Sequence, residues 1–63
     1  MPKTDVTVRL VGEDGNAFAI MGRVIAALRR AGHADLIDEY QREAMDGDYD
    51  HLLLITMEYV NVG

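Results

Sequence analysis

The chain has 63 residues, which is enough for one small domain and too few for two. It contains no cysteine, and this excludes disulfide bridges and thiolate-bound zinc. The formal net charge of −5 and the pI of about 4.6 argue against direct binding to nucleic acid, because clustered Lys and Arg supply most of that affinity.

The sequence also gives no sign of a membrane protein. None of its apolar runs approaches the roughly 20 residues that a membrane-spanning helix needs. The residues after Met1 lead directly into a strand-like run and not into a signal peptide. We therefore expect a cytoplasmic protein.

Charge is divided unevenly along the chain. Residues 1–33 carry five basic and three acidic side chains, a sum of +2. Residues 34–63 carry one basic and eight acidic side chains, a sum of −7. A surface of one sign selects partners of the opposite sign, so the second half is the first place to look for a binding surface.

The first predicted element is a strand over residues 6–11. Apolar and polar side chains alternate there, which places Val6, Val8 and Leu10 on one buried face. Turn-forming residues fill positions 12–16 and end the strand. Either Asn16 or Asp14 can cap the helix that follows.

A helix is predicted from Ala17 to Ala31, with Gly32 as the residue that ends it. Gly22 lies inside this helix, and we expect it to permit the close approach of a neighbouring backbone. Seven apolar side chains share one arc at helical spacing: Phe18, Ile20, Met21, Val24, Ile25, Leu28 and Ala31.

A second helix is predicted from Ala34 or Asp35 to Met45, with Gly47 as its stop. Its apolar face consists of four residues, and the charged residues fall outside that face. The face comprises Leu36, Ile37, Tyr40 and Ala44.

The third segment, from His51 to about Tyr59, suits either a helix or a strand. An Asp cap at position 48 or 50 and the leucine run at 52–54 favour the helix, which would be apolar nearly all round. Residues 60–62 then form a short strand beside the first. The predicted fold class is α+β, a single domain over residues 1–63 with the order β-α-α-α-β.

The stretch Asp46-Gly47-Asp48-Tyr49-Asp50-His51 has the alternating carboxylates of a calcium loop. The match fails afterwards, because His51 stands where the loop needs glycine and Met57 stands where it needs glutamate. The simpler interpretation is a junction between helices in which the aspartates cap backbone N–H groups. No cofactor is predicted.

Other motifs are incomplete. Residues 12–16 follow a strand, as phosphate loops do, but they lack the Lys and Ser/Thr of such loops. His33 and His51 could exchange protons near neutral pH, yet the chain has no Ser and no Cys to act as a nucleophile. We therefore expect a protein that is not an enzyme. Arg23, Arg29 and Arg30 form a small basic face without the aromatic residues typical of nucleic-acid binding.

Three blocks of sequence stand out as a set. They are LVGEDGNAF at residues 10–18, ALRRAG at 27–32 and GDYDHLL at 47–53. Over nearly the whole chain they resemble a family of short uncharacterised proteins of bacteria, phages and plasmids. The resemblance implies no catalytic residue. It implies that the turn at 14–18 and the junction at 48–53 share a role, and it favours a host-directed inhibitor or adaptor.

The leading hypothesis is a non-enzymatic interaction module that docks a basic protein partner through its acidic second half. The alternative is a module that binds a small ligand or a divalent metal through the loops at 14–16 and 46–51. A homodimer is a further expectation, since two strands alone make a weak sheet. The candidate partner-binding residues are Asp35, Asp38, Glu39, Glu43, Asp46, Asp48, Asp50 and His51.

Overall fold

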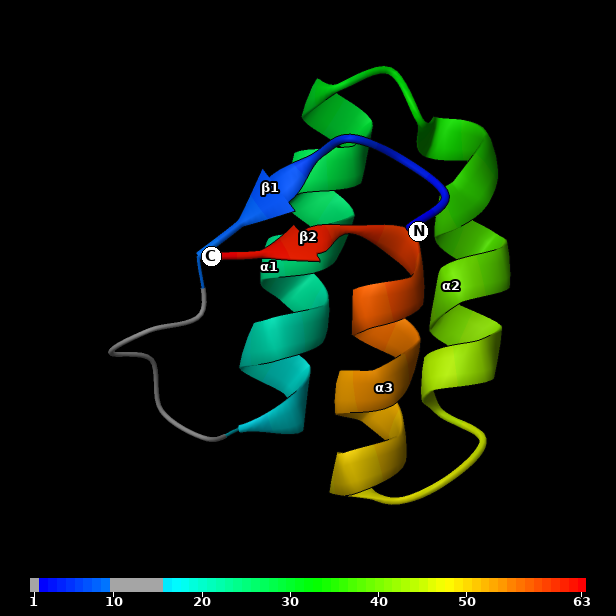
Figure 1. The fold of residues 1–63 in the computed structure, drawn as a ribbon. Helices are drawn as coiled ribbons and strands as arrows, with labels where there is room; N and C mark the ends of the chain where they lie inside the picture. Colours follow the sequence, from blue (N-terminus) through cyan, green and yellow to red (C-terminus); the bar gives the residue numbers. More distant parts are fainter. Residues whose placement is uncertain (1, 10–15) are drawn as a thin grey trace.

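The computed structural model describes residues 2–9 and 16–63. Within these ranges the chain is an α+β domain with the order strand, three α-helices, strand, as the sequence predicts (Figure 1). The elements are β1 (Thr7–Val8), α1 (Ala17–Arg30), the 3₁₀ helix η1 (Ala34–Leu36), α2 (Ile37–Ala44), α3 (Tyr49–Tyr59) and β2 (Asn61–Val62). None of the helices in the described ranges is long and apolar enough to cross a membrane.

α1 begins at Ala17, as the sequence predicts, and ends at Arg30, one residue before the predicted boundary. The Asn16 side chain accepts hydrogen bonds from the backbone N–H groups of Phe18, at 2.8 Å, and Ala19, at 3.3 Å. Gly32 follows the helix at φ +85°, a left-handed conformation that other residues adopt only at a cost. Asp14, the other candidate cap, lies outside the described residues.

The arc predicted for α1 is only partly buried. Ile20, Met21, Val24 and Leu28 are in the core, whereas Phe18 leaves 75% of its surface exposed. Phe18 lies in the first turn of α1, and Figure 1 shows that turn at an end of the bundle. A helical arc gives the direction of a side chain but not how far its neighbours extend.

The prediction for Gly22 is wrong. Gly22 is exposed, and a Cβ atom built on it would have no neighbour within 4 Å apart from its own helix. Among the described residues no backbone approaches this glycine closely, so packing between them does not require it.

The second predicted helix is divided into two parts. η1 forms its first turn, and α2 ends at Ala44, one residue before the predicted boundary. Its apolar face is confirmed, because Ile37, Tyr40 and Ala44 are buried and Leu36 packs against the core.

The third segment is a helix, as preferred, and it begins at Tyr49, two residues earlier than predicted. Asp48 is its N-cap, with the side chain accepting from the His51 N–H at 2.9 Å. Asp50 lies inside the helix, in its first turn.

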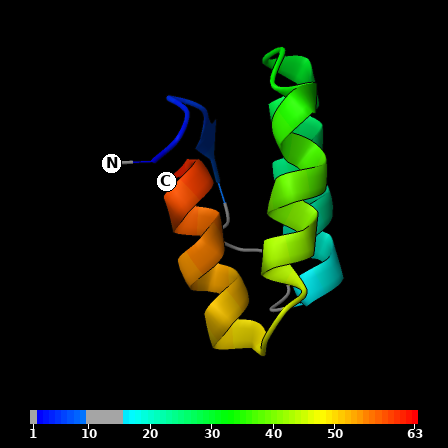
Figure 2. The ribbon, with the colours of Figure 1, turned by 90° about the vertical axis from the view of Figure 1, so that its right-hand side faces the viewer.

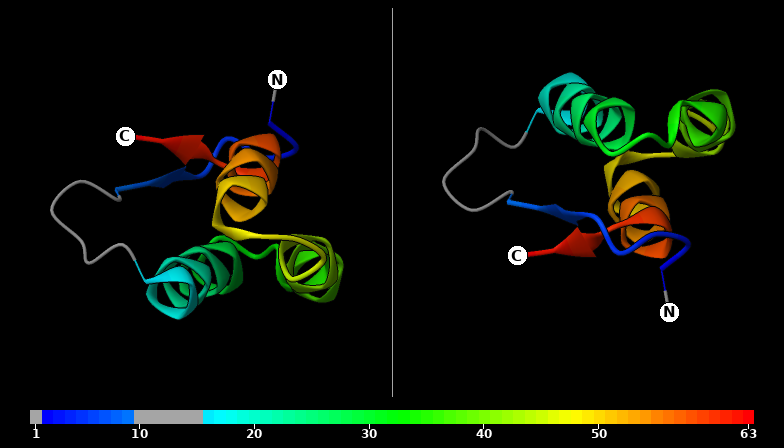
Figure 3. Two further views of the ribbon diagram at one scale, coloured as in Figure 1. Left: turned by 90° about the horizontal axis from the view of Figure 1, so that it is seen from below. Right: turned by 90° about the horizontal axis from the view of Figure 1, so that it is seen from above.

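The two strands pair in parallel, with Thr7 opposite Asn61 and Val8 opposite Val62. The described strand is shorter than the predicted one. Val8 is buried and Val6 packs against the core, while Leu10 lies outside the described residues. β1 lies between α1 and β2, so β2 forms the outer edge (Figure 3).

α2 runs antiparallel to α1 and α3, and α3 packs against α2 more extensively than against any other element (Figures 1 and 2). The core lies between these helices and the inner strand. Its fully buried members include Val24, Leu28, Tyr40, Tyr59 and Val60.

Candidate functional site

The eight candidate residues follow α2 and the connection into α3. Asp35 lies in η1, Asp38, Glu39 and Glu43 on α2, Asp46 and Asp48 in the connection, and Asp50 and His51 in the first turn of α3. All the carboxylates are exposed, and His51 is partly buried. Eight residues of helix correspond to about 12 Å, so the carboxylates are spread along the length of α2 and do not form one compact patch.

Glu39 is paired inside the molecule. The Lys3 ammonium lies 2.6 Å from Glu39 Oε2, and the Tyr59 hydroxyl donates to the same oxygen at 2.6 Å. These two contacts hold the pKa of Glu39 below its ordinary value, with the Lys3 bond as the larger cause. The same pair raises the pKa of Lys3.

Glu43 also contacts Tyr59, whose hydroxyl donates to Glu43 Oε2. The Tyr59 ring is buried, packs edge-on against Tyr40 at 5.3 Å between centroids and lies 4.6 Å from Lys3 Nζ. Burial raises the pKa of the Tyr59 phenol, and the two carboxylates raise it further. The phenol therefore remains a hydrogen-bond donor at neutral pH.

His51 closes the turn between α2 and α3. Its Nε2 atom lies 2.9 Å from the Glu43 carbonyl oxygen. Because a carbonyl oxygen only accepts hydrogen bonds, Nε2 carries the proton in this contact. The ring also covers Gly47, where an added Cβ would come within 2.6 Å of His51 Cγ. Both contacts give His51 a structural role in the turn.

The alternating aspartates do not gather around one point. Among the described residues, no group of three or more His, Cys, Asp or Glu side chains is arranged to hold a metal ion. Asp48 is occupied by the helix cap. The capping predicted by the simpler interpretation is confirmed for Asp48, whereas the Asp50 side chain caps no backbone N–H group of the described residues.

Four of the candidate carboxylates remain available to a partner. Within the described parts of the chain, these four side chains form no salt bridge and accept no hydrogen bond. They are Asp35 and Asp38 at one end of α2, and Asp46 and Asp50 at the other.

The end that carries Asp46 and Asp50 also has exposed apolar side chains. The first turn of α1 and the connection between α2 and α3 lie at this same end (Figures 1 and 2). Phe18, Met45 and Tyr49 are all exposed there. We call these five residues, Phe18, Met45, Asp46, Tyr49 and Asp50, the acidic end surface.

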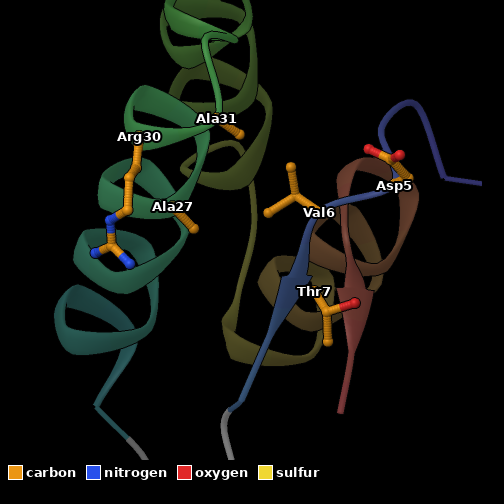
Figure 4. Close-up of a pocket in the computed structure, with 6 residues that line it drawn as sticks. All are labelled: Asp5, Val6, Thr7, Ala27, Arg30 and Ala31. Atoms are coloured by element: carbon orange, nitrogen blue, oxygen red, sulfur yellow. The ribbon is translucent and has the colours of Figure 1, made fainter.

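Two open cavities lie on the other side of the molecule. One, of about 370 Å³, separates β1 from the C-terminal half of α1 (Figure 4). Ala27 and Ala31 point from α1 toward β1, and Arg30 and Asp5 supply its charges. The second, of about 410 Å³, also includes Asp5 and extends to His33. Neither contains a candidate residue.

Sequence reasoning missed the contacts that join distant segments. It assigned no role to Lys3 or Tyr59, because the N-terminal segment, α2 and α3 meet only in the folded chain. It also assigned Phe18 to the apolar arc. The sequence did contain a signal for the exposure of Phe18, because the polar residues up to Asn16 place Phe18 at the end of the helix.

Comparisons with known proteins do not extend this description. No protein-family model, curated protein or solved structure gives a significant match to the chain.

Proposed function

We propose that this protein is a non-enzymatic interaction module that docks a basic protein partner through the acidic end surface. The observation that carries the proposal is the presence of two carboxylates without internal partners, Asp46 and Asp50, at the same end of the bundle as exposed Phe18, Met45 and Tyr49. Aromatic residues and methionine are enriched at protein interfaces, where they supply buried contact area. Carboxylates at the rim attract a basic partner and orient it.

The charge balance of the chain supports this choice. The second half has a formal charge sum of −7. The Lys3 ammonium compensates the charge of Glu39. Within the described residues Asp46 and Asp50 have no such ion pair, so their charges can attract a partner. The field acts mainly on the rate of association, so binding should weaken as salt increases.

The proposal is tested by two matched pairs of substitutions. Asp46→Asn with Asp50→Asn removes two charges from the acidic end surface, and Asp35→Asn with Asp38→Asn removes two charges from the opposite end of α2. Asp48 is left unchanged because it caps α3. The tagged variants are used to capture partners from bacterial lysate at low and high salt, and each captured protein is then purified for titration.

We expect the partner to be basic, to be lost at high salt and to bind the first variant about tenfold more weakly, the effect of roughly 1.4 kcal/mol. The second variant should bind nearly as well as the unmodified protein. Equal weakening by both pairs would show that only net charge matters. Unchanged binding by the first pair would contradict the proposal.

A further inference from the structure

α3 carries an exposed apolar stripe that the fold does not cover. Leu54 and Met57 leave 62% and 58% of their surfaces exposed, on the helix whose other side contributes Leu52, Ile55, Thr56 and Tyr59 to the core. At 100° per residue, Asp50, Leu54 and Met57 fall within about 60° of one another. Figure 3 shows α1 and α2 on one side of α3 only.

Carboxylates lie at both ends of this stripe. Asp50 and Glu58 are exposed, and they stand four residues before and four residues after Leu54. The spacing puts an acidic group about 6 Å along the helix axis from Leu54 in each direction. α3 contains no Lys or Arg. Lys3 of the N-terminal segment lies near Glu58, but its ammonium is paired with Glu39.

We infer that the stripe formed by Asp50, Leu54, Met57 and Glu58 is the docking site for a basic amphipathic helix. Apolar side chains of such a helix would cover Leu54 and Met57, and its lysines or arginines would reach Asp50 and Glu58. This is recognition of an amphipathic helix through anchors at helical spacing, here on an exposed helix face. The inference rests on the proposed function, because Asp50 belongs to both surfaces, and it specifies the partner's secondary structure.

A second copy of the chain fits the stripe poorly. In an antiparallel pair of α3 helices, Asp50 of one copy would approach Glu58 of the other, and in a parallel pair each acid would face its own equivalent. Each arrangement places like charges together, on a chain whose net charge is already −5. Charge complementarity therefore selects a basic occupant.

The test uses a synthetic peptide of about 14 residues in which leucines recur at helical spacing and lysines fill the other positions. A peptide of the same composition in scrambled order keeps the charge and loses the amphipathic pattern. Binding is followed by amide chemical shifts of the protein and by anisotropy of a fluorescent label on the peptide.

The protein variant is Leu54→Gln with Met57→Gln, which changes exposed residues and should leave the fold intact. Its matched control is Ala19→Gln with Ala26→Gln, which puts two glutamines on exposed positions of α1. We expect the patterned peptide to shift the amides of residues 50–58 and to bind the α3 variant at least about tenfold more weakly. The α1 control should bind as the unmodified protein does.

Three results would overturn the inference: equal affinity for both peptides, unchanged affinity of the α3 variant, or concentration-dependent self-association mapped to residues 50–58. Failure here is distinguishable from failure of the proposed function. If Asp46→Asn with Asp50→Asn weakens the captured partner while Leu54→Gln with Met57→Gln does not, the acidic end surface binds and the α3 stripe does not.

Discussion

Asn16 and Asp48 show how much a single residue type can indicate. Each precedes an apolar segment, and the side chain of each accepts a hydrogen bond from a backbone N–H group of the next helix. Short polar side chains are favoured at this position because the first N–H groups of a helix have no partner within it. Capping is local, so the sequence placed both caps among its candidates, with Asp14 as the alternative to Asn16 and Asp50 as the alternative to Asp48.

Gly22 is a residue whose role the sequence does not indicate, because a glycine can occur inside a helix for several reasons. The structure leaves open space around it. We therefore expect Gly22→Ala to stabilise the protein by about 0.5–1 kcal/mol, because alanine loses less backbone entropy on folding. Urea unfolding followed by circular dichroism measures this change.

The control for that substitution is Gly32→Ala. Gly32 has φ +85°, so alanine there should destabilise the protein by about 1–2 kcal/mol, although nothing crowds the site. A destabilised Gly22→Ala protein would mean that a residue outside the described ranges, or a partner, approaches α1.

At the scale of the elements, one buried polar contact joins α2 to α3. The Tyr40 hydroxyl and Thr56 Oγ1 lie 2.8 Å apart, and both residues are fully buried. Burial raises the pKa of Tyr40, so its hydroxyl remains protonated. The contact joins two helices whose surrounding core is otherwise apolar.

A double-mutant cycle tests this contact. Tyr40→Phe and Thr56→Val should each cost about 1–2 kcal/mol, because each leaves the other hydroxyl buried without its partner. The double variant should cost less than the sum by about 1 kcal/mol. Chemical denaturation of the four proteins gives the coupling, with exposed Tyr49→Phe as a control that should change little. Additive costs would mean that water or backbone groups replace the lost hydrogen bond.

At the scale of the whole molecule, the N-terminal segment ties the strand pair to the helices. The backbone N–H groups of Lys3 and Thr4 donate to the carbonyl oxygens of Glu58 and Tyr59, respectively. The Thr4 hydroxyl donates to the same Tyr59 carbonyl oxygen at 2.7 Å. The Lys3 side chain then extends to Glu39 on α2. Three segments that are distant in the sequence are joined here.

This arrangement predicts a dependence of stability on pH. Lys3 and Tyr59 lower the pKa of Glu39 from its ordinary value of 4.5, so the folded state favours the charged carboxylate. The contribution is present above pH 4.5 and is lost as the pH falls through the lowered pKa. Thermal unfolding of the unmodified protein should therefore show a decline in this acid range.

Lys3→Gln should make the acid decline smaller, because it removes the larger of the two causes. Loss of the contact between Lys3 and the Tyr59 ring lowers stability equally at every pH and leaves the slope unchanged. Glu39→Gln should likewise flatten the profile. Parallel profiles for the unmodified protein and Lys3→Gln would show that the ion pair adds nothing in solution, as is common for exposed pairs.

The sequence by itself determined the order of elements and the buried face of α2, and it reduced the caps of α1 and α3 to two candidates each, because capping, helical periodicity and turn chemistry act over a few residues. The tertiary structure decided which carboxylates stay available, since Lys3 and Tyr59 reach the carboxylates of Glu39 and Glu43 only across the fold. It also decided that Phe18, Leu54 and Met57 remain exposed. Whether an apolar side chain is covered depends on how far neighbouring elements extend, and no local pattern contains that information.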